Sequence, residues 1–128
     1  CKIVGLCVGM QILADTGSEL ISTRSKGLGL IGGHVQKMKN FHTGWNHLNS
    51  DSKSLKNLTK FCNKSFYFNH LNYIQLNDKK NMKMYSFNEE IKIPSVVINK
   101  NIFGFQFHPE KSQEIGRKLL EFCIKGNL

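Results

Sequence analysis

Two short segments carry side chains that could act together as a nucleophile and its base. In the first, Gly5-Leu6-Cys7-Val8-Gly9, a cysteine follows an apolar run and glycines stand two residues before and two after it. This spacing is typical of a nucleophile elbow, a sharp turn between a strand and a helix. The helix that follows directs N–H groups at the sulfur, which favours the reactive thiolate. We expect the backbone N–H of Val8 to help hold an oxyanion.

The second segment is Phe107-His108-Pro109-Glu110, which follows a strongly apolar stretch. Pro109 biases His108 toward an extended backbone, and Glu110 can then accept a hydrogen bond from the His108 ring. Such a bond fixes the tautomer and leaves the other ring nitrogen for a nucleophile. Each segment alone has an ordinary interpretation, a core cysteine or a surface turn. Together they predict a Cys-His-Glu arrangement for nucleophilic catalysis.

The elements around these segments predict an α/β fold. Residues 2–6 have the pattern of a buried parallel strand, and a helix is expected to start at the turn because Met10, Leu13, Ala14 and Gly17 recur at helical spacing. In an open parallel sheet the strands end at one edge, so Cys7 and His108 are expected to lie at that edge.

The rest of the chain is predicted to be mostly β. Residues 24–33 form a glycine-rich loop and residues 49–64 an exposed loop or short helix. A final helix is predicted, capped by Ser112 and ended by Gly126, with one apolar face. Strands are expected at residues 34–38, 65–69, 72–76, 82–87, 95–99 and 102–107.

Composition narrows the class of protein. A chain of 128 residues suits one domain. The formal net charge is +9, but the lysines are scattered and form no stripe, which favours compositional drift over a nucleic-acid surface. No apolar run is long enough to span a bilayer. The four cysteines form no C-x-x-C pair, which argues against a zinc site, and we expect free thiols in a cytoplasmic protein.

The motifs resemble those of class I (triad) glutamine amidotransferases, and more narrowly the glutaminase subunits of imidazole glycerol phosphate synthase. The resemblance rests first on Gly5 to Gln11 and on His108-Pro109-Glu110. Four further segments match in order along the chain, the last of them at the closing motif: residues 26–31, 42–46, 66–70 and 103–113. The resemblance implies a flavodoxin-like α/β domain with a mixed sheet, of which residues 1–128 are the C-terminal portion.

The resemblance also implies roles for particular residues. Cys7 attacks the carboxamide of glutamine, His108 carries protons and Glu110 orients it. Gln11 and His70 help to bind glutamine. Lys111 lies at the interface with the synthase partner and Trp45 near the passage for ammonia. The implied partner is a (βα)8-barrel cyclase subunit of the histidine pathway, and no cofactor, metal, nucleic acid or membrane is involved.

The sequence departs from the family pattern at Asn69, Leu71 and Asn72, where the family has Val, Ser or Thr, and Tyr. The chain also starts with Cys1 inside an apparent strand, so we expect an N-terminal part that carries the family's glycine-rich oxyanion strand to be missing, and the fragment by itself to be an incomplete enzyme. Two alternatives remain open. One is a paralogous glutaminase that supplies ammonia for an amino sugar of a surface polysaccharide. The other is an inactive binding module.

Overall fold

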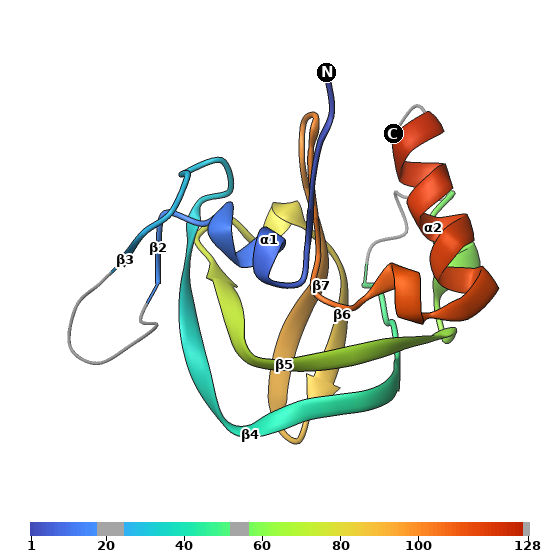
Figure 1. The fold of residues 1–128 in the computed structure, drawn as a ribbon, viewed down its shortest axis with the longest axis horizontal. Helices are drawn as coiled ribbons and strands as arrows, with labels where there is room; N and C mark the ends of the chain where they lie inside the picture. Colours follow the sequence, from blue (N-terminus) through green and yellow to red (C-terminus); the bar gives the residue numbers. More distant parts are fainter. Residues whose placement is uncertain (18–24, 52–56, 127–128) are drawn as a thin grey trace.

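Residues 1–17, 25–51 and 57–126, the part of the chain that this computed structural model describes, form two four-stranded sheets with short helices at their edges and one longer helix on the outside (Figure 1). The elements in chain order are β1 (Ile3–Leu6), α1 (Val8–Ile12), β2 (Thr16–Gly17), β3 (Ser25–Lys26), β4 (Gly33–His47), the 3-10 turn η1 (Thr59–Phe61), β5 (Ser65–Leu76), η2 (Lys79–Asn81), β6 (Met82–Asn88), β7 (Ile91–Asn99), β8 (Ile102–Phe105), η3 (Pro109–Lys111) and α2 (Gln113–Lys125). No described helix is long and apolar enough to cross a membrane.

The first sheet has the order β1-β8-β7-β6 and is mixed. β1 pairs with β8 in parallel, from Ile3 opposite Ile102 to Leu6 opposite Phe105, while β7 is antiparallel to both of its neighbours. Because β1 and β8 run the same way, the chain leaves both strands at the same edge of the sheet. The expected mixed α/β sheet is confirmed, and so is the common edge for the segments that follow these two strands.

The second sheet, β3-β2-β4-β5, is dominated by two strands that are longer than the sequence predicted. The strands expected at 65–69 and 72–76 are one continuous strand, β5, and the strand expected at 34–38 extends to His47 in β4. The two pair antiparallel in two blocks, with a register shift between Lys37 and His42. At the junction of the two predicted strands His70 lies opposite His42 of β4 and its ring bonds to the His42 ring, so the strand continues through this point.

Helix α1 is shorter than the periodicity predicted, because the glycine-rich loop ends it. The N–H groups of Gly27 to Ile31 donate to the carbonyls of Ile12, Leu13, Ala14 and Asp15, which a longer helix would have used itself. The loop comes so close that a Cβ on Gly27 would lie 2.0 Å from the Ala14 oxygen. The expectation that Gly17 extends the helix is wrong, since Gly17 lies in β2.

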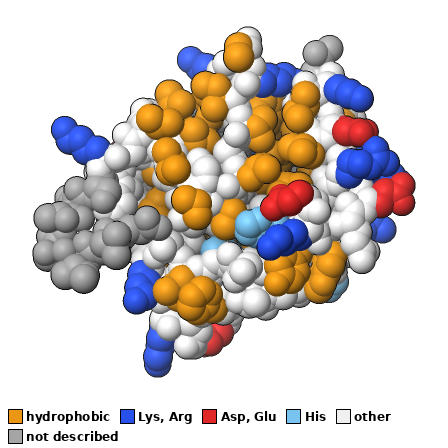
Figure 2. Space-filling view, in the orientation of Figure 1, with side chains coloured by type: hydrophobic (Ala, Val, Ile, Leu, Met, Phe, Trp, Pro, Cys, Tyr) orange, Lys and Arg blue, Asp and Glu red, His pale blue; other side chains and the backbone are white. Residues whose placement is uncertain are grey.

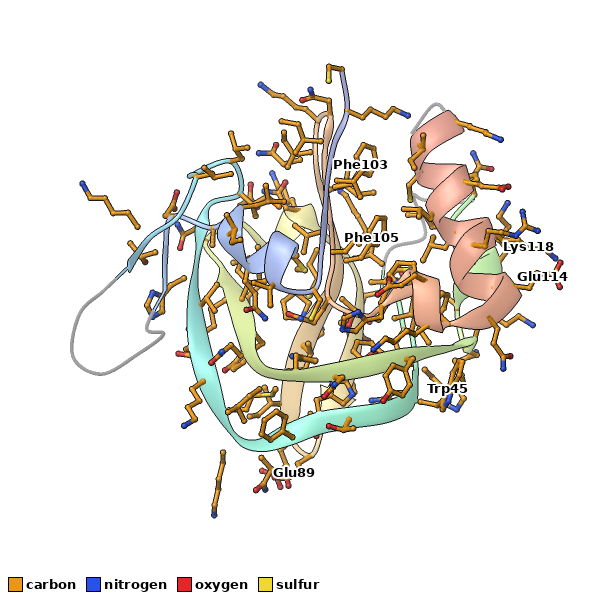
Figure 3. The ribbon with its side chains drawn as sticks, viewed as in Figure 1. Trp45, Glu89, Phe103, Phe105, Glu114 and Lys118 are labelled. Atoms are coloured by element: carbon orange, nitrogen blue, oxygen red, sulfur yellow. The ribbon has the colours of Figure 1, made fainter. Side chains whose placement is uncertain are left out.

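Helix α2 packs on the first sheet through a largely aromatic core. Phe103 and Phe105 on β8 project toward α2, where Leu119 and Cys123 are fully buried (Figure 3). The outer face of α2 carries the ion pair Glu114–Lys118. This packing agrees with the predicted apolar face.

Ser112 does not cap α2 with its side chain, contrary to the prediction. Its hydroxyl donates to the carbonyl of His108 at 2.6 Å and accepts from the N–H of Tyr67 at 2.9 Å. The serine therefore ties the segment of His108 to β5 instead of closing the helix, because its hydroxyl is engaged as donor and acceptor by these two backbone groups.

Gly116 allows the first turn of α2 to approach η3, and its replacement tests this packing. A Cβ at this position would lie 2.2 Å from the Pro109 carbonyl oxygen and 2.7 Å from the Ser112 Cβ. Gly116→Ala is expected to lower the free energy of unfolding by about 1–3 kcal/mol, because a backbone atom blocks the new methyl group.

Urea denaturation of the full-length protein measures this change. Gly17→Ala is the matched control, because among the described residues its Cβ would meet only the Val35 Cβ, at 3.6 Å. Equal unfolding midpoints for the two variants contradict the prediction.

Candidate active site

Cys7 occupies a strained turn between β1 and α1. Its φ of 50° and ψ of −107° fall in a region that residues with a side chain rarely adopt. Backbone hydrogen bonds hold it there. The N–H of Cys7 donates to the Phe105 oxygen at 2.7 Å, and its carbonyl accepts from Met10 and Gln11. The predicted nucleophile elbow is confirmed in its backbone geometry.

The two glycines of the elbow differ in their surroundings. A Cβ on Gly5 would lie 2.6 Å from the Gly9 carbonyl oxygen, so the close approach of β1 and α1 requires glycine there. A Cβ on Gly9 would meet nothing within 4 Å of it in the described structure. Among the described residues, close packing therefore requires glycine at Gly5 but not at Gly9.

His108 and Glu110 form the pair that the sequence predicted. The Nδ1 atom of His108 lies 2.6 Å from a carboxylate oxygen of Glu110. Pro109 starts the 3-10 turn η3 that turns the carboxylate back toward the ring, and the His108 N–H donates to the Tyr67 oxygen of β5 at 2.8 Å. Because the carboxylate occupies Nδ1, only Nε2 remains to exchange a proton with another group.

The environment of Cys7 favours the thiol more than the sequence suggested. Burial raises the pKa of Cys7, and the charge of Glu110 raises it further, while the Val8 N–H, the Gln106 amide and the charge of Lys111 lower it. The Val8 N–H at the start of α1 favours the thiolate, as expected, but the net shift of the Cys7 pKa is upward. Burial outweighs this hydrogen bond, because the sulfur is largely removed from water.

The strand order brings the two predicted segments to one edge of the first sheet. Charges on Glu110 and Lys111 act on the sulfur of Cys7, although the residues are far apart in the chain. The parallel pairing of β1 with β8 brings them to the same edge of the sheet. Cys7 and the His108–Glu110 pair therefore lie toward the same edge of this sheet.

Two neighbours of the sulfur had no role in the sequence prediction. The Cys7 Sγ lies 3.8 Å from the Asn69 carbonyl oxygen and 3.8 Å from Nε2 of Gln106. Gln106 directly follows β8 and is fully buried. In the sequence, Gln106 is marked only by its place within the matched segment before His108. Full burial of a glutamine side chain is unusual in proteins.

A line of buried polar side chains runs on from Gln106. The Nε2 of Gln11 donates to Gln106 Oε1 at 3.4 Å and to the Asn72 carbonyl at 3.0 Å. That carbonyl also accepts from Nδ1 of His70 at 2.7 Å. The Gln11 amide N–H groups therefore already have protein acceptors, and a role of Gln11 in binding glutamine stays a prediction.

His70 continues this line to His42 and Asn46. Its Nε2 is 2.8 Å from Nδ1 of His42, and Nε2 of His42 is 2.9 Å from Nδ2 of Asn46. Because the Asn72 carbonyl can only accept, His70 must carry its proton on Nδ1 and His42 must donate to it from Nδ1. Both nitrogens of His70 have partners, so a role in binding glutamine stays a prediction, while its structural role follows from these bonds.

The line of hydrogen bonds is complete only when both histidines are neutral. Burial, with a smaller effect of His70, lowers the pKa of His42 from 6.5 to about 4. Burial, together with the charge of His108, lowers the pKa of His70 to about 4, although its bond to Asn72 opposes the shift. The two rings therefore act as uncharged hydrogen-bonding spacers at neutral pH.

The two residues predicted at a partner interface lie on the surface. Trp45 is 51% exposed, which excludes the ordinary role of a core tryptophan, and its ring stands edge-on to Tyr67 at 6.0 Å (Figure 3). Lys111 is exposed at the end of η3. Both positions are open to a partner, and their roles there stay predictions.

Exposed apolar side chains also gather near the elbow. Figure 2 shows hydrophobic side chains clustered on the face that carries β1 and α1, and Ile3, Val8 and Ile12 are among the exposed ones. Val8 and Gln11 line a hollow there together with Thr16, Gly17, Lys26 and Val35. The surface beside the nucleophile is therefore apolar, with few charges.

Cys62 and Cys123 have structural surroundings, whereas Cys1 is exposed. All four cysteines are free, and Cys123 is fully buried in the core with a pKa that burial raises to about 12. Cys62 packs against the same core, and burial raises its pKa too. Within residues 1–17, 25–51 and 57–126, no cluster of histidine, cysteine and acidic side chains could hold a metal ion.

The His42–His70 pair predicts a loss of stability in mild acid. In the unfolded chain both histidines become protonated below their usual pKa of 6.5. In the folded protein they become protonated only near pH 4. Stability from the neutral pair is therefore present above pH 6.5 and lost as the pH falls toward 4. We expect the variant His42→Phe/His70→Phe to show a shallower fall in melting temperature over this range.

Thermal melts between pH 7 and 4 measure this difference. In the double variant Asn72 still accepts from Gln11 and Asn46 still donates to the Phe87 carbonyl, so no polar partner is orphaned. His47→Gln, at an exposed histidine, is the control and should follow the parent. Parallel curves for the parent and the double variant would exclude the pair as the source of the acid sensitivity.

The chain is similar in sequence to proteins of known name. Two relatives are named subunits of imidazole glycerol phosphate synthase: HisH 2 of Methanococcus maripaludis is 39% identical over 129 residues, and HisH of Lactococcus lactis is 40% identical over 127. The matches cover 96% of this chain, which spans only 62% and 61% of the length of these relatives.

Solved structures agree in fold alone. A structure described as a putative GMP synthase protein from Thermoplasma acidophilum has a TM-score of 0.65 at 22% identity, covering 97% of this chain and 56% of that one. A glutamine amidotransferase from Thermotoga maritima has a TM-score of 0.55 at 19% identity, covering 95% and 46%. The family model described as glutamine amidotransferase class-I matches residues 2–125, and together with the relatives it shows that the chain belongs to the class I glutamine amidotransferase family.

Proposed function

We propose that this chain carries the catalytic cysteine, histidine and glutamate of a glutaminase that releases ammonia for a synthase partner. The observation that carries the proposal is the pairing of a strained cysteine elbow with a histidine whose Nδ1 is held by a carboxylate at 2.6 Å. Both stand at the end of neighbouring parallel strands. Glutamine is the substrate class of the family to which the chain belongs.

The reaction follows from the roles that the three side chains can fill. The thiolate of Cys7 attacks the carboxamide carbon of glutamine, and the carbonyl oxygen takes up the negative charge near the Val8 N–H. His108 gives a proton to the leaving nitrogen as the C–N bond breaks, which yields ammonia and a thioester. His108 then removes a proton from water, which attacks the thioester and frees glutamate and the Cys7 sulfur.

Glu110 serves this cycle by orienting the imidazole and stabilising its charged form. Its negative charge also raises the pKa of Cys7, which opposes formation of the thiolate before His108 is protonated. The thiolate and the imidazolium are therefore expected to form together, by transfer of the proton from sulfur to Nε2 of His108.

The relatives' names support a particular acceptor. They are called subunits of imidazole glycerol phosphate synthase, so the partner in this proposal is the cyclase subunit of that enzyme, acting in histidine biosynthesis in the cytoplasm. The exposed positions of Trp45 and Lys111, on β4 and after β8, support their assignment to the partner interface and the ammonia passage. A passage lined by carbonyl groups or apolar side chains suits ammonia, because ammonia is small and uncharged.

A covalent label tests the nucleophile. The glutamine analogue 6-diazo-5-oxo-norleucine is expected to modify Cys7 selectively in the full-length protein with its cyclase partner, and excess glutamine should block it. Peptide mass spectrometry locates the modification. Cys62 and Cys123 serve as internal controls. Labelling of these thiols at the same rate as Cys7 would contradict the assignment of Cys7 as the nucleophile.

Substitutions test the three roles by their order. Cys7→Ala should abolish glutamine hydrolysis without unfolding the protein. His108→Asn should lower kcat by about 10²–10⁴-fold, the usual contribution of a general acid and base. Glu110→Gln should lower it less, because an orienting group is partly dispensable.

Steady-state glutamate release by the full-length complex gives these values, with circular dichroism as the check on folding. Lys118→Ala, on the exposed face of α2, is the control with parent activity expected. A larger loss from Glu110→Gln than from His108→Asn would contradict the assigned roles.

A further inference from the structure

Gln106 is the one fully buried amide whose nitrogen faces the nucleophile among the described side chains. Its Nε2 lies 3.8 Å from the Cys7 Sγ, and the residue is 0% exposed. Its backbone N–H donates to the Ser95 carbonyl at 3.0 Å, which fixes the residue at the end of β8. Burying an amide costs free energy unless its hydrogen bonds are satisfied, so the partners of the Gln106 amide must account for its place beside the sulfur.

The orientation of this amide follows from a carbonyl that cannot be reversed. The Asn72 carbonyl oxygen can only accept, so Gln11 must present its nitrogen there, at 3.0 Å. The same nitrogen lies 3.4 Å from the oxygen of the Gln106 amide. Because Gln11 donates to that oxygen, Gln106 is left with its N–H groups toward the sulfur.

The sulfur has different partners in its two protonation states. As a thiol it can donate its proton to the Asn69 carbonyl, 3.8 Å away. As a thiolate it can only accept, and a carbonyl oxygen is then an unfavourable neighbour. The Gln106 N–H is the side-chain donor at hand for the thiolate, beside the backbone N–H of Val8.

We infer that Gln106 is a positioning residue that holds the sulfur of Cys7 and stabilises its thiolate, with Gln11 fixing the direction of the Gln106 amide. The inference rests on the proposed role of Cys7 as the nucleophile, and it explains how a thiol in a buried site is made reactive. The amide side chain of Gln106 lowers the pKa of Cys7, which agrees in direction. Hydrogen bonds from neutral donors to a buried anion are among the stronger ones in proteins.

The test is the pH dependence of Cys7 alkylation in the full-length protein. Iodoacetamide reacts with the thiolate, so the midpoint of the rate against pH reports its formation, and peptide mass spectrometry assigns the rate to Cys7. Gln106→Met keeps the size of the side chain and removes the donor. We expect it to raise the midpoint by about one pH unit, which is roughly a tenfold slower reaction at pH 7.

Two further glutamine-to-methionine variants complete the set. Gln11→Met leaves Gln106 in place but frees its amide to turn, so it should raise the midpoint by a smaller amount. Gln75→Met, at an exposed position of β5, should leave the midpoint unchanged. The rate at high pH should not fall in any variant, because a less acidic thiol is at least as nucleophilic once ionised.

The outcomes separate this inference from the proposed function. An upward shift of the midpoint with Gln106→Met and Gln11→Met, but not with Gln75→Met, supports the inference. This holds even if the parent fails to hydrolyse glutamine, a result that would contradict only the proposed function. A parent that hydrolyses glutamine while all four proteins share one midpoint overturns the inference and leaves the glutaminase intact. If Gln106→Met does not fold, an unshifted Gln11→Met midpoint overturns it as well.

Discussion

The parallel pairing of β1 with β8 is the interaction on which the site depends. It aligns two segments about a hundred residues apart in the chain, and its last bond, from the Cys7 N–H to the Phe105 carbonyl at 2.7 Å, holds the strained backbone of the nucleophile. The chain leaves β8 at the same edge and reaches His108 three residues later. Without this ladder the elbow would relax, because nothing local favours a cysteine with a φ of 50°.

Close approaches of backbone to backbone keep this edge compact. Gly5 lets β1 meet α1, Gly27 lets the glycine-rich loop end α1, and Gly116 lets α2 meet η3. In each case the atom that a Cβ would strike is a backbone carbonyl oxygen, which cannot move aside as a flexible side chain would. These three contacts set the spacing of the elements that carry Cys7 and His108.

The interior next to the nucleophile is polar but largely uncharged. Amide groups of Gln106 and Gln11 and the neutral rings of His70 and His42 form one line of hydrogen bonds from the sulfur to β4. Neutral groups suit such a place because burying them with partners costs far less than burying charges. The charged members of the site, Glu110 and Lys111, stand instead at its exposed rim.

The sequence alone predicted the cysteine elbow, the His108–Glu110 pair and the mixed α/β class, because a cysteine between spaced glycines and a His-Pro-Glu segment can be recognised over a few residues. The pairing of β1 with β8 and the junction of residues 65–69 and 72–76 into one strand were decided by the tertiary structure, since both depend on partners distant in the chain.

Tertiary contacts also diverted Ser112 from capping a helix and ended α1 at Ile12. They also raised the pKa of Cys7 by burying it, which outweighs the lowering effect of the Val8 N–H that the local pattern predicted. Gln106 shows the limit most clearly. Nothing in the sequence marks its amide as part of the site, and only the position of β8 brings the amide nitrogen to 3.8 Å from the sulfur.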